Sequence, residues 1–112
     1  MSKPIARPYS QYNLDALQLL GQLVREGRLA KALTTTDLAM RAGISRALLQ
    51  RIERGDPSCS IGAVFETAAI CGVALFESSA RQLAVKLANH GEKMALLPKS
   101  VRAGKKEVND DF

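Results

Sequence analysis

The segment 34–54 constrains the fold of this chain more than any other, because it places two short helical patterns around a single tight turn. Thr34 can cap the first helix, and the Asp37 carboxylate can bond back to it, as in a short capping box. Gly43 then ends that helix, since glycine tolerates the left-handed conformation that follows a helix C-terminus. Only one residue separates it from Ser45, which is itself a good helix cap. The segment therefore predicts a helix-turn-helix.

The second helix of this segment, expected at about Arg46 to Arg54, has two chemically different sides at about 100° per residue. One side is aliphatic and must pack against the rest of the domain. The other side carries three arginines, a glutamine and an alanine; these are Arg46, Ala47, Gln50, Arg51 and Arg54. Arginine can bind guanine bidentately, glutamine can bind adenine, and alanine can contact a thymine methyl. The alternative is that this basic face is simply solvated. However, the helix follows directly after a capped helix and a glycine turn, which favours a face that binds duplex DNA.

The apolar pattern predicts five helices and hence an all-α fold. A first helix begins at Asn13, its expected cap, and contains Gly21 and Gly27. A glycine inside a helix costs up to about 1 kcal/mol relative to alanine, so these two indicate close approach by a crossing helix. Ser60 is expected to cap a fourth helix, and a fifth is expected from about residue 75 to residue 89. The expected core residues are Leu14, Leu17, Leu20, Leu23 and Val24, then Leu38, Ala39 and Ala42, then Leu48, Leu49 and Ile52, then Ile61, Val64, Phe65 and Ala68, and finally Leu75, Phe76, Leu83 and Leu87.

Three parts of the chain follow from this pattern. Residues 1–12 are expected to form an N-terminal arm, residues 13–90 the helix-turn-helix domain, and residues 91–112 a tail. The formal net charge of +5 favours a polyanionic partner. The positive excess lies in residues 1–60 and in the tail, whereas residues 61–90 are balanced.

Composition argues against several other classes of protein. The two cysteines, Cys59 and Cys71, are twelve residues apart with one distant histidine, which is not a zinc ligand set. That histidine, His90, has no placed carboxylate partner, so we expect neither an enzyme nor a cofactor. There is no secretory signal and no membrane-spanning apolar run. We therefore expect reduced thiols and a cytoplasmic protein, nucleoid-associated when it is bound to DNA.

The stretch from Leu20 to Phe76 resembles the Cro/phage-repressor (Xre-type) helix-turn-helix family. The shared pattern is a Leu-Gly start, a Thr cap, Leu-Ala, Ala-Gly-Ile-Ser and Arg-Ile-Glu-Arg-Gly, which stand here at Leu20-Gly21, Thr34, Leu38-Ala39, Ala42 to Ser45 and Arg51 to Gly55. The resemblance implies that Arg46, Ala47 and Arg51 contact bases, and the chemistry of the same helix face adds Gln50 to them. It also implies that Thr34, Thr35, Ser45 and Arg54 contact phosphates, although the family often has glutamine at the position of Thr35. Arg28 and Glu53 match a pair that usually forms a buried ion pair.

Two flanking segments, RIERGDPSCSIGAVF and LLPKSVRAGKKEVNDDF, resemble the HipB-type antitoxins encoded beside HipA-like kinases. That resemblance implies a homodimer that binds operator DNA, represses its own operon, and binds and restrains a HipA-like serine/threonine kinase toxin. The kinase is either one chain or divided into more than one. The alternative is a stand-alone Xre-type repressor without a toxin partner.

The beginning of the tail carries a short apolar patch. Met94, Leu96 and Leu97 are expected to contact the partner or a second copy of the chain, and a short strand near 94–97 is one form of that contact. Residues 98–112 are expected to be disordered.

Overall fold

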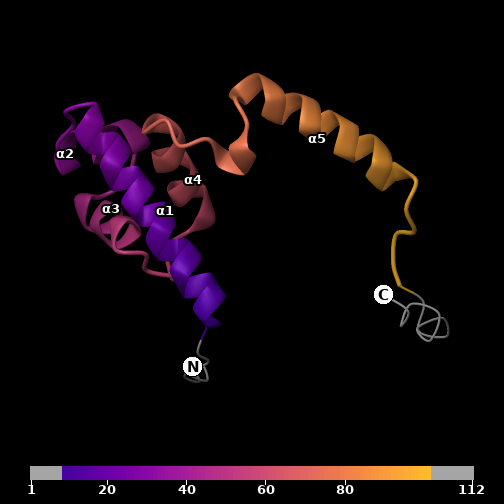
Figure 1. Ribbon diagram of the computed structural model, residues 1–112, viewed down its shortest axis with the longest axis horizontal. Helices are drawn as coiled ribbons and strands as arrows, with labels where there is room; N and C mark the ends of the chain where they lie inside the picture. The colour runs from indigo at the N-terminus through magenta and orange to yellow at the C-terminus, as the bar shows by residue number, and fades with distance from the viewer. Residues whose placement is uncertain (1–8, 102–112) are drawn as a thin grey trace. The chain divides into compact units, whose positions relative to one another are not determined.

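The computed structural model describes residues 9–101, which form five α-helices and one short 3-10 helix and contain no strand. The elements, shown in Figure 1, are α1 (Gln11–Ala30), α2 (Thr35–Ala42), α3 (Arg46–Glu53), α4 (Ile61–Ile70), η1 (Leu75–Glu77) and α5 (Ala80–Ala95). The all-α prediction is confirmed, and the short strand near 94–97 is wrong because α5 continues to Ala95. The parts of the predicted arm and tail at 1–8 and 102–112 lie outside the described residues.

The chain divides into two compact units, the first ending at Glu77 and the second beginning at Ser78. The predicted end of the helix-turn-helix domain at residue 90 stays a prediction. The first unit contains α1 to α4 and η1, and the second contains α5.

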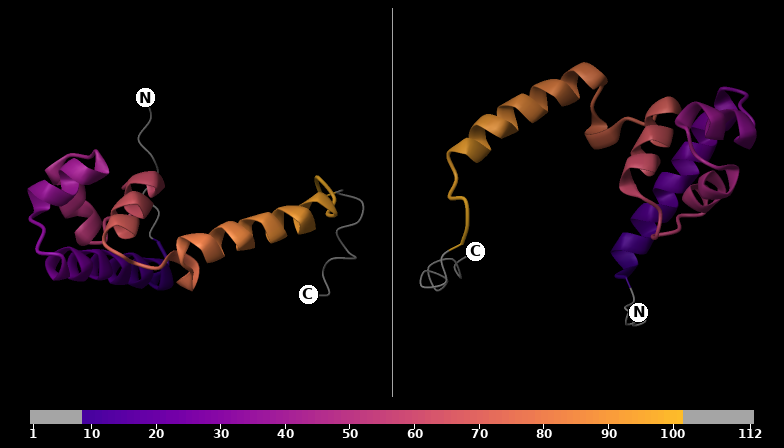
Figure 2. Two further views of the ribbon diagram at one scale, coloured as in Figure 1. Left: turned by 90° about the horizontal axis from the view of Figure 1, so that it is seen from above. Right: turned by 180° about the vertical axis from the view of Figure 1, so that it is seen from behind.

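The core of the first unit is aliphatic and is shared by four helices. Val24 of α1, Leu38 of α2, Leu49 of α3 and Ala68 of α4 are all completely buried. Helix α1 packs on α3 and α4, and α2 packs on α3 and α4. The left panel of Figure 2 shows α2, α3 and α4 together on one side of α1. Most predicted core residues thus lie where the apolar pattern placed them.

Both glycines inside α1 lie at a close helix approach, which confirms their predicted role. A Cβ atom built at Gly21 would lie 2.6 Å from the carbonyl oxygens of Ile52 and Glu53, at the end of α3. A Cβ atom at Gly27 would meet the carbonyl oxygen of Cys71, which caps α4. Larger side chains at either position would push α1 away from the helix it crosses.

The two short helices of the predicted helix-turn-helix begin and end as the sequence indicated. The Asp37 amide donates to Thr34 Oγ1 over 3.0 Å, and the Thr34 amide donates to the Asp37 carboxylate over 3.0 Å, completing the capping box of α2. Gly43 caps its C-terminus at φ +70°. Ser45 then accepts from the amide of Leu48 and caps α3.

Three predicted helix ends are wrong. Helix α1 begins two residues before Asn13, because Ser10 is its cap and accepts the Asn13 amide. The fifth helix begins at Ala80 instead of Leu75, since Ser79 and Gln82 form a capping box there and a left-handed Phe76 interrupts the chain before it. It also continues past Gly91 to Ala95. Ser60 stands at the cap of α4 as predicted, but its side chain makes no capping bond.

Some residues predicted for the core are exposed: Leu14, Leu23, Ile61, Phe76 and Leu87. The first two lie at the edge of the buried side of α1, at 36% and 37% exposure. Ile61 is the first residue of α4 and is 69% exposed. The left-handed backbone of Phe76 leaves its ring 68% exposed, in edge-on contact with Phe65.

Candidate nucleic-acid interface

Helix α3 buries its aliphatic side and exposes its polar side. Leu49 and Ile52 are buried, whereas Arg46, Ala47, Gln50 and Arg54 are exposed. The structure therefore brings these four predicted base- and phosphate-contacting residues onto one accessible face. Within residues 9–101, neither Arg46 nor Arg54 forms an ion pair. Both guanidinium groups are available to an anionic partner.

Arg51 differs from the other two arginines because it is held by its own chain. Its Nε donates to Asp56 Oδ2 over 2.9 Å, and its Nη2 donates to Ser58 Oγ over 2.6 Å. Side-chain exposure is 39% for Arg51 and 30% for Asp56, so the pair remains reachable from solvent. The hydrogen bond and charge of Asp56 raise the pKa of Arg51. The pKa of Asp56 is held well below its usual range, first by hydrogen bonds from Ser58 and then by Arg51.

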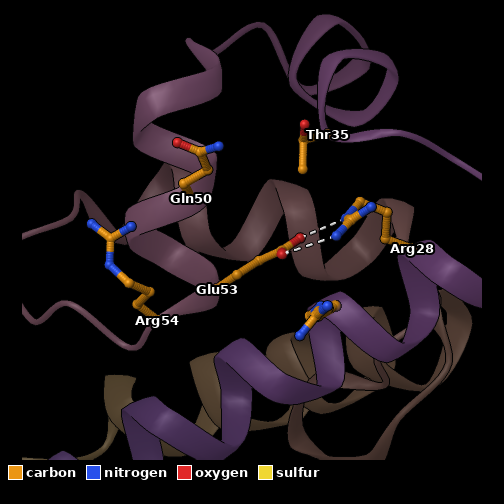
Figure 3. A pocket seen from close by; sticks show the side chains of 6 residues that line it. Arg28, Thr35, Gln50, Glu53 and Arg54 are labelled. Carbon is orange, nitrogen blue, oxygen red and sulfur yellow. Dashed lines mark hydrogen bonds and ion pairs between the residues drawn. The ribbon is translucent and has the colours of Figure 1, made fainter.

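An open cleft of about 410 Å³ lies beside the outer face of α3, between α1 and the start of α2. Its lining residues are Arg25, Arg28, Thr35, Gln50, Glu53 and Arg54, most of which are labelled in Figure 3. Sequence reasoning missed Arg25, which is exposed on α1. The available signal was its spacing, because a residue three positions before Arg28 lies on the same side of a helix.

Arg28 and Glu53 both line this cleft and are bonded to each other (Figure 3). Arg28 Nε and Nη2 donate to the two Glu53 carboxylate oxygens over 2.8 and 3.2 Å, and Nη1 donates to the carbonyl of Leu33 over 3.0 Å. Side-chain exposure is 9% for Arg28 and 10% for Glu53. The hydrogen bond to Glu53 raises the pKa of Arg28. Because this charge is neutralised inside the protein, the unpaired cations that line the cleft are Arg25 and Arg54.

Four hydroxyl side chains stand at the N-terminal ends of α2 and α3, those of Thr34, Thr35, Thr36 and Ser45. The Thr34 and Ser45 oxygens each accept a backbone amide, which leaves their O–H hydrogens free to donate. Thr35 begins α2 and lines the cleft (Figure 3). The first amides of each helix are also unpaired donors. Hydroxyls, amides and arginines of this kind are the groups that bind phosphate in proteins.

The model of a helix-turn-helix domain family matches residues 19–77, just over half of the chain. The chain therefore belongs to this Xre-like family of helix-turn-helix domains, whose members bind DNA, regulate transcription and typically carry no catalytic activity. No curated protein and no solved structure matches the chain.

Between residues 9 and 101, none of the helices has the length and apolar character needed to cross a membrane. No group of three or more potential metal-ligating side chains was found in that range. Cys59 and Cys71 are both free thiols.

Proposed function

We propose that this protein is a sequence-specific repressor whose helix α3 enters the major groove of operator DNA. Arg46, Ala47, Gln50 and Arg51 contact base edges in this proposal, because their side chains occupy the outer face of α3. The observation that supports it most strongly is that this face is exposed while its aliphatic side is buried. An α-helix with free arginines and a glutamine matches the width and the donor pattern of that groove.

The cleft beside α3 supplies the phosphate contacts in this proposal. Arg25 and Arg54 are the unpaired cations of the cleft, and Thr35 adds a hydroxyl at the start of α2. Thr34 and Ser45 extend the donor set along the same two helix ends. Contacts of this type set the register of a protein on DNA without reading sequence.

We propose that the protein acts as a homodimer through the apolar side of α5. Leu83, Leu87 and Met94 recur at helical spacing along α5, and Leu97 follows one turn later. Leu87 is 74% exposed and Met94 is 52% exposed in the single chain. A second copy would cover this side and would present two recognition helices to successive major grooves, about 34 Å apart. Such a dimer on a palindromic operator represses by occluding the promoter.

The more specific role that we propose is that of a HipB-type antitoxin, which represses its operon and also restrains a HipA-like kinase. The support is the sequence similarity of the segments at 51–65 and 96–112, together with the exposed apolar residues Met94, Leu96 and Leu97 at the end of α5. These residues can contact either the second copy or the kinase. A stand-alone repressor is the alternative, and it needs only the DNA-binding face and the dimer.

Two substitutions separate base contacts from phosphate contacts. Arg46→Ala should weaken binding to the selected operator by about 1–3 kcal/mol more than it weakens binding to random DNA. Arg25→Ala should weaken both DNAs equally and reduce the log–log salt slope by about one unit. Titration of both variants against both duplexes at several salt concentrations measures this. Equal losses on the two duplexes for Arg46→Ala would reassign that residue to phosphate.

Co-expression tests the antitoxin role. If the reading frame beside this gene encodes a HipA-like kinase, the tagged kinase should co-purify with this protein and should arrest growth less in its presence. A kinase that fails to co-purify, or whose toxicity is unchanged, would contradict the antitoxin role. That result would leave DNA binding and the stand-alone repressor intact.

A further inference from the structure

We propose that Asp56 and Ser58 are positioning residues that hold Arg51 as a preorganised guanine-reading group. This inference rests on the proposed function, because it concerns how one residue of α3 contacts DNA. It adds two residues of the following loop to the determinants of specificity. It also distinguishes Arg51, whose charge is paired with Asp56, from Arg46 and Arg54, whose charges are unpaired within the described residues.

The turn after α3 brings this loop back against the helix. Gly55 adopts φ +80°, and its amide donates to the carbonyl of Ile52 over 3.0 Å. The Asp56 amide donates to the carbonyl of Arg51, also over 3.0 Å. These two bonds form a Schellman motif, which reverses the chain immediately after the helix. The reversal places the Asp56 side chain beside Arg51, five residues earlier.

Asp56 and Ser58 are hydrogen-bonded to each other as well as to Arg51. Asp56 Oδ1 accepts the Ser58 amide over 2.8 Å and the Ser58 hydroxyl over 2.7 Å. Asp56 Oδ2 remains for Arg51 Nε, and Ser58 Oγ accepts from Arg51 Nη2. The three side chains therefore form a closed network in which each position depends on the other two.

This network uses one edge of the guanidinium and leaves another edge free. A guanidinium has five N–H donors in a rigid plane, and Asp56 and Ser58 take one from Nε and one from Nη2. The remaining three include a parallel pair at the end of the side chain, one on each Nη atom. Two parallel donors match the O6 and N7 acceptors of guanine. An arginine bound in this way has less side-chain freedom to lose when it meets DNA.

The charge of the network also favours contact with a base over contact with phosphate. Arg51 and Asp56 form an ion pair, so together they add little net attraction for phosphate. Arg46 and Arg54 have no such partner within the described part of the chain and keep their full charge. The network therefore retains the directional hydrogen bonds of Arg51 and suppresses its nonspecific attraction for the DNA backbone.

Ser58→Ala tests the inference without changing the charge of the protein. The full-length wild type first selects duplexes from a random pool, and Arg51→Ala identifies the base pair whose guanine preference depends on Arg51. Ser58→Ala should reduce that preference about three- to tenfold, because the guanidinium loses one of the two hydrogen bonds that hold it. Preferences at the other base pairs and affinity for random DNA should not change. Ser60→Ala is the matched control, since the Ser60 side chain makes no capping bond, and it should leave every preference unchanged.

A second variant and a double variant complete the test. Asp56→Ala should lower the same preference and raise the affinity for random DNA, because Arg51 becomes an unpaired cation. In an Arg51→Ala background, Ser58→Ala should have no further effect on any base pair. Melting temperatures of all variants separate a specific loss of the Arg51-dependent preference from a general loss of helix stability. A general loss would reduce binding to every sequence equally.

Three results would overturn the inference. One is a wild type that selects a sequence while Ser58→Ala and Asp56→Ala retain every preference. A second is an Arg51→Ala variant that retains the wild-type preferences. Both leave the proposed function standing. The third is a wild type that selects no sequence at all, which would overturn the proposed function as well.

Discussion

At the scale of single residues, the Arg28–Glu53 pair joins α1 to the C-terminal end of α3 and orients that helix. Both side chains are about nine-tenths buried, and every Arg28 nitrogen donates a hydrogen bond. A buried charge that loses its partner is costly, whereas replacing both partners by apolar side chains is often neutral. The pair should therefore respond very differently to single and double substitution.

Arg28→Met should lower the free energy of unfolding by about 3–5 kcal/mol, because it strands the Glu53 carboxylate. The double variant Arg28→Met/Glu53→Leu should recover most of that loss. Urea denaturation measures both. A single-variant loss below about 1 kcal/mol, as for an exposed pair, would show that the pair contributes little to the fold.

Gly21 and Gly62 provide a matched pair for the close contact between α1 and α3. Gly21→Ala should lower the free energy of unfolding by about 1–3 kcal/mol, since the new Cβ would lie 2.6 Å from two carbonyl oxygens of α3. A Cβ atom built at Gly62 on α4 would have no atom within 4 Å. Gly62→Ala should therefore raise the free energy of unfolding by up to about 1 kcal/mol. Thermal or urea unfolding compares them. Equal effects at both positions would mean that α1 and α3 can separate without loss.

The residues of α3 itself were predictable, but the environment of Arg51 was not. Helical periodicity alone separates Leu49 and Ile52 from the polar side, so the exposed face followed from the sequence. The bond from Arg51 to Asp56 spans five residues across a chain reversal, which is not a spacing that brings side chains together on a helix. It depends on the turn at Gly55, and its geometry became visible only in three dimensions.

At the scale of elements, the capping box of α2 makes the start of this helix sensitive to acid. The hydrogen bonds of Thr34 lower the pKa of Asp37 in the folded protein below the ordinary value of 3.8. A carboxyl whose folded pKa is depressed stabilises the fold above its unfolded pKa, and that stabilisation is lost as the pH falls through the folded pKa.

Asp37→Asn should therefore lower the melting temperature near neutral pH and have progressively less effect as the pH falls from about 5 to about 2. Melting curves of the wild type and the variant across that range measure it. Both the wild type and Asp37→Asn should lose some stability in acid, because the pKa of Asp56 is lowered in both proteins. A difference between wild type and Asp37→Asn that stays constant with pH would contradict this account.

The limits of α5 show why some elements were harder to predict than others. The apolar residues Leu75 and Phe76 continue the helical pattern of the fifth helix, yet Phe76 adopts φ +55° and the helix begins only after the Ser79 cap. Glycine is common at helix ends, but Gly91 lies inside α5. Capping boxes are decided by a few local hydrogen bonds, and an isolated glycine lowers helix stability by only about 1 kcal/mol.

At the scale of the whole molecule, the first unit was largely predictable and the second was not. Val24, Leu38, Leu49 and Ala68 pack against one another within the first unit, so their pattern specifies its core. Leu87 follows the same kind of pattern but is exposed in the single chain. A sequence pattern indicates that such a residue is buried, without indicating whether its own chain or another chain buries it.

Leu87→Asp should therefore disrupt the proposed homodimer, because it places a charge in the apolar side of α5. Val85→Asp is the control, since Val85 is 55% exposed and lies on the opposite side of the same helix. Sedimentation equilibrium should find a dimer for the wild type and Val85→Asp, and a monomer for Leu87→Asp. A wild-type monomer, or a dimer that tolerates both substitutions equally, would remove α5 as the dimer contact.

The measurement that tests the central claim most directly maps the DNA contact on the full-length protein. Amide resonances are recorded by NMR before and after addition of a duplex that the protein itself has selected from a random pool. The largest shifts should fall on the outer face of α3 between Arg46 and Arg54, and at Thr34 and Thr35 at the start of α2. Shifts confined to α5, or no shifts and no selected duplex, would contradict the assignment of α3 as the DNA-binding helix.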